Sequence, residues 1–182
     1  VRCNDSVKPW ENVRLKGEDI RKGGTVVAVG TRLTAGTIGL LAATGHGSLE
    51  VGLQPKVGLV ATGSELVEPP DNLQPGEIYE SNRAMLASLV ARANGLPTRY
   101  PVVPDSLEAT VDALERAFAE NDAVVTSGGV SVGDHDHVRP AIERLGGSLD
   151  FWKVAVKPGK PFVLGQAYGK PLFGLPGNPV SA

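Results

Sequence analysis

The sequence predicts an α/β fold: a three-layer α/β/α domain with a mostly parallel sheet, preceded by a partial β-rich segment. From Lys56 onward, short apolar runs alternate with segments whose apolar residues recur at helical spacing, as expected of strands joined by helical crossovers. The runs are continuous rather than alternating, which is typical of strands buried on both faces. Glycine and proline, 23 and 14 of the 182 residues, fall between the runs as turn residues do.

The chain is expected to divide near residue 50. Residues 1–50 are interpreted as the end of a truncated β-rich N-terminal domain plus a linker helix, and residues 51–182 as the α/β domain, truncated at its C-terminal end. A polar, glycine-rich stretch at 46–55 predicts the linker. The chain starts at Val1 and its only methionine is Met85, so we expect a fragment of a longer protein.

The first segment is expected to hold one strand and one helix. Residues 25–29 predict a short strand, one of the closing strands of the β-rich domain. Thr34 can cap a helix whose apolar positions include Ile38 and Leu41. Gly45 is expected to end this helix.

The elements of the α/β domain follow in regular order. Strands are predicted at 57–61, 100–103, 122–126, 151–156, 162–164 and 172–175, with a turn at Tyr168 and Gly169 before the last. A first helix is predicted to start at Ser81 or Asn82, with an apolar face of Met85, Leu86, Leu89 and Val90. A second is predicted to start at Asp105 or Ser106, with an apolar face of Leu107, Val111, Leu114 and Phe118. A third is predicted after the glycine-rich loop, with Val138, Ile142 and Leu145 on its apolar face.

Composition narrows the classes of function. Charged residues make up 21% and the formal net charge is -2, so no basic field indicates nucleic-acid binding. No apolar run approaches the roughly 20 residues of a membrane span. The single cysteine, Cys3, excludes an internal disulfide and suits a reducing compartment, so we expect a cytoplasmic protein.

The stretch 126–136 is the strongest candidate for a binding site. A strand, a glycine-rich turn and a helix start together form a common anion cradle, because glycine lets the backbone approach a phosphate and the helix N-terminus favours negative charge. Two carboxylates, Asp134 and Asp136, lie in the same loop and would repel an anion unless a cation lay between them. The loop therefore predicts a phosphate bound with Mg²⁺. The alternative is a plain glycine turn with an aspartate that caps the helix.

Further polar residues follow the other predicted strands. Ligands bind at the carboxyl ends of the strands in an open parallel sheet, so we expect these residues to converge. Glu65, Asp105 and Asp136 come from three strand ends, and three carboxylates at one edge predict a shared cation. The alternatives are a first-turn acid for Glu65 and a helix cap for Asp105.

Two more segments complete the candidate site. Lys153, Lys157 and Lys160 lie in a short proline- and glycine-containing segment, where they could hold phosphate or an oxyanion as point charges. The alternative is an edge strand guarded by lysines. The turn at 174–179 carries Asn178, which could bind a polar ligand, although a plain strand-to-helix turn would look the same.

Six short motifs, in order, resemble the molybdopterin molybdenumtransferase family, the MoeA type that also includes the E domain of gephyrin. The motifs are Ala-Thr-Gly-Ser-Glu-Leu at 61–66, Ile-Tyr-Glu-Ser-Asn-Arg at 78–83, Ser-Gly-Gly-Val-Ser-Val-Gly-Asp at 127–134, Phe-Trp-Lys at 151–153, Lys-Pro-Gly-Lys-Pro at 157–161 and Gly-Leu-Pro-Gly-Asn-Pro-Val-Ser at 174–181. Ser64 departs mildly from the aspartate often found in the first motif. The resemblance implies a domain with the fold of the MogA proteins.

The resemblance also implies a reaction. Members of this family insert molybdate into adenylylated molybdopterin and release AMP with the help of Mg²⁺, as homodimers that receive their substrate from an adenylyltransferase and serve molybdoenzymes. The candidate catalytic residues are Asp105, Asp136, Lys153 and Lys157; the candidate metal ligands are Glu65, Asp105 and Asp136; and the candidate binding residues are Thr62, Gly63, Ser127, Gly128, Gly129, Ser131, Gly133, Lys160, Pro176, Gly177, Asn178 and Pro179.

Two other functions are compatible with parts of this pattern. The related molybdopterin adenylyltransferase uses the same central fold, but the segments at 157–161 and 174–179 and the leading residues favour the molybdenum-inserting class. A scaffold that clusters receptors, as gephyrin does, is the other possibility, and no motif in this chain supports it.

Overall fold

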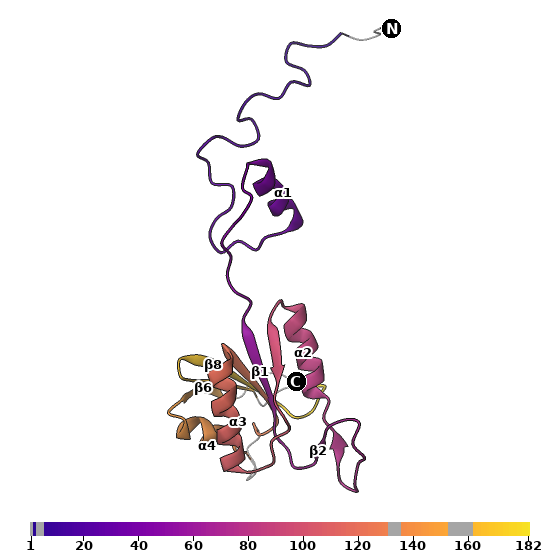
Figure 1. Cartoon of the computed structure of the whole chain (residues 1–182), viewed down its shortest axis with the longest axis vertical. Coiled ribbons are helices and arrows are strands. Elements are labelled where there is room, and N and C mark those ends of the chain that lie inside the picture. Colours follow the sequence, from indigo (N-terminus) through magenta and orange to yellow (C-terminus); the bar gives the residue numbers. More distant parts are fainter. Residues whose placement is uncertain (1, 3–5, 131–135, 153–161) are drawn as a thin grey trace. The chain divides into compact units, whose positions relative to one another are not determined.

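The computed structural model describes residues 2, 6–130, 136–152 and 162–182 (Figure 1). The chain falls into two compact units, Val1–Gly52 and Leu53–Ala182. Among the helices of the described residues, none has both the length and the apolar composition that crossing a bilayer requires.

The first unit contains the predicted helix, α1 (Ala35–Ala43). Thr34 caps it as expected, since its side-chain oxygen accepts a hydrogen bond from the backbone N–H of Thr37. The strand predicted at 25–29 is wrong: those residues form bends and turns. A strand needs a partner for its backbone groups, and the described part of this unit offers no second strand.

The second unit is built on a six-stranded sheet in the order β4-β1-β5-β8-β7-β6. The strands are β1 (Lys56–Ala61), β4 (Leu96–Arg99), β5 (Ala123–Ser127), β6 (Ser148–Trp152), β7 (Val163–Ala167) and β8 (Lys170–Leu175). Neighbours among β4, β1, β5 and β8 pair in parallel, and β7 runs antiparallel to both of its neighbours. The predicted mostly parallel sheet is confirmed.

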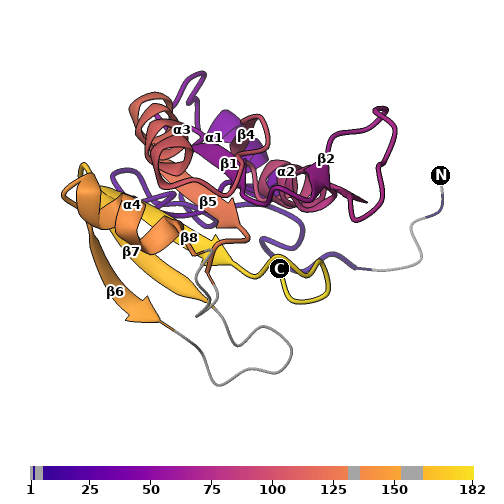
Figure 2. The ribbon, with the colours of Figure 1, turned by 90° about the horizontal axis from the view of Figure 1, so that it is seen from below.

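Helices pack against both faces of the sheet at β1. Its residues Leu59 and Val60 point to opposite faces, and they are 0% and 1% exposed. α3 (Leu107–Glu120) and α4 (Val138–Arg144) lie side by side (Figure 2), whereas α2 (Asn82–Arg92) packs against β1 and β4. The main core cluster lies under α3 and α4.

α2 begins at Asn82, as predicted, but its first turn is capped in an unexpected way. The Ser81 side chain makes no capping bond; instead the Glu80 carboxylate accepts a hydrogen bond from the backbone N–H of Arg83 at 2.8 Å. Asn82 and Arg83 are buried in the first turn, although their polar side chains gave no reason to expect it. Ser106, one of the two predicted starts of α3, caps that helix with its hydroxyl.

The second predicted strand lies four residues earlier than expected, at β4 rather than at 100–103. Tyr100 and Val103 still donate to the carbonyls of β1, at 3.0 and 2.9 Å. The Val102 N–H, which would continue the ladder, donates instead to the Glu68 carboxylate at 3.2 Å, so the regular ladder ends after Tyr100. The apolar run at 100–103 lies past the end of the strand.

The remaining elements are the turn between β7 and β8, the edge strand β6 and a small second sheet. The turn at Tyr168 and Gly169 has positive φ at both residues, 55° and 71°, and joins β7 to β8 as a two-residue hairpin, as predicted. The strand expected at 151–156 begins earlier, as β6, and residues 153–156 lie outside the described residues. A second, two-stranded parallel sheet, β2 (Leu66–Val67) with β3 (Ile78–Tyr79), was not predicted.

Leu114→Ala is expected to lower the free energy of unfolding by about 3 kcal/mol, because Leu114 is fully buried in the core and its removal leaves a cavity. Leu89 of α2 is 47% exposed, so Leu89→Ala should lower the free energy of unfolding by under about 1 kcal/mol. Urea unfolding followed by circular dichroism compares the two variants. Equal losses would show that the core is not where the structure has it.

Candidate functional site

A pocket of about 810 Å³ opens where the strands of the sheet end. It is lined by Ala61, Thr62, Gly63, Glu65, Leu66, Ile78, Tyr79, Glu80, Ser81, Asn82, Asp105, Ser127, Gly128, Gly129, Asp136, Gly177, Asn178 and Pro179. These residues follow β1, β4, β5 and β8 or belong to the small sheet and the start of α2. The predicted convergence holds for the strand ends whose residues line the pocket, and the lysine segment at 157–160 lies outside the described residues.

Most of the described candidate residues line this pocket. Pro176 lies behind its wall instead, where it is buried and its carbonyl accepts a hydrogen bond from the Ser127 hydroxyl at 3.3 Å. Five candidates lie outside the described residues: Ser131, Gly133, Lys153, Lys157 and Lys160.

The glycines of the site serve close packing of the backbone. Gly128 and Gly129 have positive φ, 84° and 64°. A Cβ atom on Gly128 would lie 2.5 Å from the Thr62 carbonyl oxygen, and one on Gly129 would lie 2.8 Å from the Thr62 hydroxyl. Only glycine fits these two positions, since both the conformation and the space exclude a side chain.

Two backbone N–H groups of the glycine-containing loops donate within the protein. The N–H of Gly128 donates to the Leu175 carbonyl at 3.1 Å, and that of Gly63 donates to the Val103 carbonyl at 3.0 Å. These two N–H groups are hydrogen-bonded within the protein and are not free to bind an anion. Their bonds instead tie the loop after β5 to β8 and the loop after β1 to the end of the β4 segment.

The three candidate carboxylates line the same pocket in different environments. Glu65 is exposed. Asp105 is half-buried, and it forms a reciprocal pair with Ser64: its carboxylate accepts from the Ser64 N–H at 3.1 Å, and the Ser64 hydroxyl accepts from the Asp105 N–H at 3.0 Å. Asp105 therefore joins the loop after β1 to the start of α3, while the helix cap itself is Ser106.

The carboxylate of Asp136 is only partly hydrogen-bonded. One carboxylate oxygen accepts from the Val138 N–H at 3.3 Å, while the other is buried and finds no hydrogen-bond partner among the described residues. Burial raises the pKa of Asp136 to about 6, against the smaller lowering effect of that backbone bond. An acid held in this way at a pocket wall is suited to bind a cation or to hold a proton.

The described residues do not form a ready-made metal cluster. No three of their acidic, histidine or cysteine side chains come close enough together to hold one ion. The assignment of Glu65, Asp105 and Asp136 as ligands of a shared cation therefore stays a prediction. The donor chemistry still fits Mg²⁺, which takes one or two carboxylates and completes its shell with water and phosphate oxygens.

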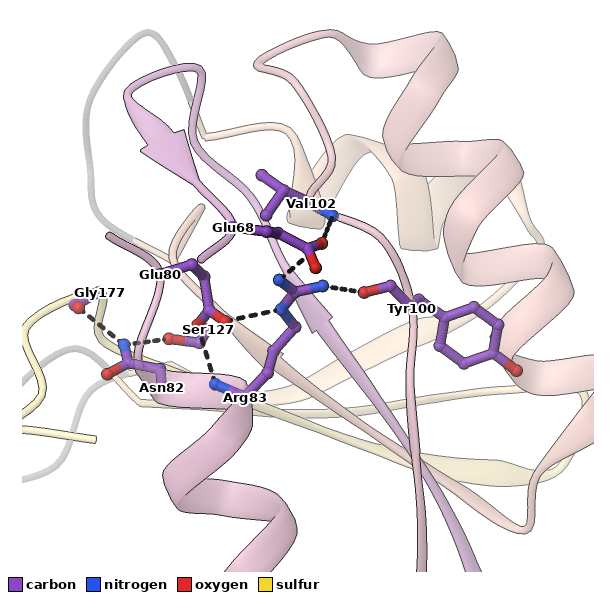
Figure 3. A network of polar contacts seen from close by, with 8 residues as sticks. All are labelled: Glu68, Glu80, Asn82, Arg83, Tyr100, Val102, Ser127 and Gly177. Atoms are coloured by element: carbon purple, nitrogen blue, oxygen red, sulfur yellow. Dashed lines mark hydrogen bonds and ion pairs between the residues drawn. The ribbon is translucent and has the colours of Figure 1, made fainter. Parts of the chain in front are cut away.

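Asn82, which sequence analysis considered only as a helix start, joins two walls of the pocket (Figure 3). Its amide nitrogen donates to the Ser127 hydroxyl at 2.6 Å and to the Gly177 carbonyl at 2.7 Å. The carbonyl of Gly177 can only accept, so the orientation of the amide is fixed. The motif at 78–83 was the only signal for this role, and it does not by itself tell which residues are buried.

Comparisons with known proteins agree with this geometry. Residues 58–182 match the family described as a probable molybdopterin binding domain, and residues 1–45 match the family described as the MoeA N-terminal region, domains I and II. The family resemblance inferred from the six motifs is confirmed.

Curated relatives give the same result. The molybdopterin molybdenumtransferase of Haemophilus influenzae is 41% identical over 182 residues, 100% of this chain and 45% of the relative. That of Staphylococcus epidermidis is 40% identical over 174 residues, 96% of this chain and 42% of the relative. The chain therefore spans less than half the length of these relatives.

Solved structures confirm the fold class. The molybdopterin biosynthesis MoeA protein of Pyrococcus horikoshii has a TM-score of 0.73 and 35% identity, covering 96% of this chain and 41% of that chain. The tungsten cofactor synthesizing protein MoaB of Pyrococcus furiosus has a TM-score of 0.53 and 18% identity, covering 72% of this chain and 87% of that chain. At that identity the second likeness shows the fold alone.

Gly128→Ala is expected to lower the free energy of unfolding by about 2 kcal/mol, because the new methyl group would meet the Thr62 carbonyl and the backbone has positive φ. Gly47→Ala is the control, since a methyl group at that position would meet no other atom within 4 Å. Thermal unfolding of the two variants measures the difference. An unchanged melting temperature for Gly128→Ala would contradict the close approach of the two loops.

Asp136→Asn is expected to stabilise the protein by about 1 kcal/mol at pH 7, because it removes a buried charge that lacks a full set of partners. Because its pKa is raised, the Asp136 carboxyl holds its proton up to a higher pH in the folded parent than in the unfolded chain. The parent is therefore most favoured below the ordinary pKa of 3.8 and loses stability as pH rises toward 6.

The gain from Asp136→Asn should accordingly shrink when unfolding is measured at pH 4 rather than pH 7. Asp71→Asn, at an exposed position, is the control and should show no such gain. A loss of stability at pH 7 for Asp136→Asn would mean that the carboxylate has a partner that favours its charged form.

Proposed function

The chain belongs to the family of probable molybdopterin-binding domains, and we propose that the protein carrying it is a molybdopterin molybdenumtransferase. In this reaction molybdate is inserted into adenylylated molybdopterin, the link between AMP and the molybdopterin phosphate is cleaved, and AMP leaves. The observation that carries the proposal is the pocket at the strand ends, where acids and glycine loops from separate strands meet. The named relatives, which share about 40% identity with the chain, support the same activity.

The pocket suits a substrate with a polar group at one end and a flat, partly apolar ring system at the other. Glycine loops and small residues line its floor, and Tyr79 and Ile78 add apolar surface at 46% and 55% exposure. Ser127 and Gly129 lie where a phosphate could approach the backbone. We assign Thr62, Gly63, Gly177, Asn178 and Pro179 to the same binding surface, with Pro176 as its support.

Glu65, Asp105 and Asp136 are the residues that would hold Mg²⁺ together with the substrate phosphates. When bound, the ion would neutralise phosphate charge and favour departure of AMP. Asp136 contributes a buried oxygen without a protein partner. Asp105, tied to Ser64, keeps the loop after β1 at a fixed distance from α3.

Lys153, Lys157 and Lys160, with Ser131 and Gly133, complete the proposed anion-binding surface. Lysine ammonium groups would hold molybdate and phosphate oxygens as point charges, and Lys153 and Lys157 are assigned catalytic roles on that ground. These assignments come from the sequence pattern and from the resemblance of the motifs at 151–153 and 157–161 to the family.

The proposal extends to the setting of the enzyme. We infer a cytoplasmic homodimer that receives adenylylated molybdopterin from an adenylyltransferase and passes the finished cofactor to molybdoenzymes. We assign residues 51–182 to the molybdopterin-binding domain and residues 1–50 to the end of a β-rich domain with a linker helix.

The test is release of AMP from adenylylated molybdopterin by the full-length protein that contains this chain. Release should require both molybdate and Mg²⁺, and Asp136→Asn should slow it by about 100-fold or more, because a charged group facing the phosphates is lost. Asp71→Asn is the matched control and should keep full activity. AMP release that does not need molybdate, or net adenylylation of molybdopterin from ATP, would assign the protein to the adenylyltransferases instead.

A further inference from the structure

The small sheet forms one wall of the pocket. Leu66 of β2 and Ile78 and Tyr79 of β3 line it, and so does Glu65, the residue that precedes β2. The backbone carbonyl of Glu65 accepts a hydrogen bond from the N–H of Ile78 at 2.9 Å. The position of Glu65 therefore depends on the pairing of β2 with β3.

That pairing places two carboxylates next to each other. β2 and β3 are parallel, with Val67 opposite Tyr79 as the last pair, so Glu68 and Glu80 follow at the same end of the sheet. Like charges at neighbouring positions on paired strands disfavour the pairing. A sheet of two residues per strand has few hydrogen bonds with which to resist that repulsion.

Arg83, from the first turn of α2, lies between the two carboxylates (Figure 3). Its Nη2 is 2.9 Å from the carboxylate of Glu68, and its Nε is 2.9 Å from that of Glu80. Its Nη1 donates to the backbone carbonyl of Tyr100, which follows β4. One guanidinium thus joins both strands of the small sheet to the edge of the large one.

The burial of these groups shows that the arrangement is a fixed one. The side chains of Arg83 and Glu80 are each 5% exposed, while that of Glu68 is 52% exposed. Burying charges is costly unless they are paired and hydrogen-bonded, and here each partner makes more than one bond. The hydrogen bond from Arg83 also lowers the pKa of Glu68, against the opposing effect of burial.

Arg83 itself does not line the pocket. We propose that it is a positioning residue: it holds the carboxyl ends of β2 and β3 together against α2 and thereby fixes Glu65 and Tyr79 at the pocket wall. The proposal rests on the proposed function only for the identity of the ligand, since the contacts that define it lie within the protein.

Glu68→Gln is the variant that tests this role, because Glu68 is the half-exposed partner and glutamine keeps its shape and its acceptor for the Val102 N–H. Hydrogen exchange of the Ile78 and Glu80 amides, which bond across the small sheet to Glu65 and Val67, should become about three- to fivefold faster. Exchange in β1 and β5 and the midpoint of urea unfolding should stay unchanged.

Glu108→Gln is the matched control, since Glu108 forms an exposed ion pair with Arg144 at 3.6 Å on the other helices. It should leave exchange at 65–80 unaltered. Unchanged exchange in Glu68→Gln, or faster exchange that extends equally to β1 and β5, would overturn the proposal, because it would show no effect or only a general loss of stability.

A ligand measurement separates positioning from local stability. AMP with Mg²⁺, titrated by calorimetry into the full-length protein, should bind severalfold more weakly to Glu68→Gln and to Arg83→Lys, which keeps the charge but loses the planar fork. Unaltered AMP affinity in Glu68→Gln alongside faster exchange would refute the link to the pocket. If the parent does not bind AMP, the nucleotide site of the proposed function fails, while the exchange experiment still decides whether Arg83 holds the wall.

Discussion

Parallel pairing in register is the constraint on which the pocket depends. Ala61 at the end of β1 lies opposite Ser127 at the end of β5, and Ser127 lies opposite Leu175 at the end of β8. The three strands therefore stop at one line, and the loops that follow them leave the sheet at the same edge. Strand pairing thus brings together residues that are more than a hundred positions apart in the sequence.

The first turn of α2 holds the surroundings of that edge. Two adjacent residues act in different directions: Asn82 binds the ends of β5 and β8 through Ser127 and Gly177, and Arg83 binds the small sheet through Glu68 and Glu80. Burial of these polar groups would be unfavourable if they were alone, and it is tolerated because their donors find acceptors. Such a network favours one arrangement of the loops over many similar ones.

Asp136 shows that the site is not optimised for stability. The second oxygen of this carboxyl group is buried and has no partner in the part of the chain that the structure describes, so we expect it to weaken the fold at neutral pH, yet it places a hard oxygen ligand at the pocket wall. Residues that cost stability and face a pocket are typical of binding sites, because the missing partner is supplied by the ligand. The glycines nearby contribute differently, since their role is to let the backbones of neighbouring loops pass close to each other.

The sequence by itself determined the alternation of strands and helices, the cap at Thr34, and the set of residues at the strand ends, because these follow from local periodicity and from the chemistry of single residues. It misplaced the strand at 100–103, where the Val102 N–H donates to a side chain instead of to β1, and the one at 25–29, where the described part of the unit has no partner strand. Only the tertiary structure decided the burial of Asn82 and Arg83, the small sheet, and the use of the glycine N–H groups within the protein. Those features depend on pairing between distant segments, and a hydrogen bond to a distant carbonyl leaves no periodic pattern in the sequence.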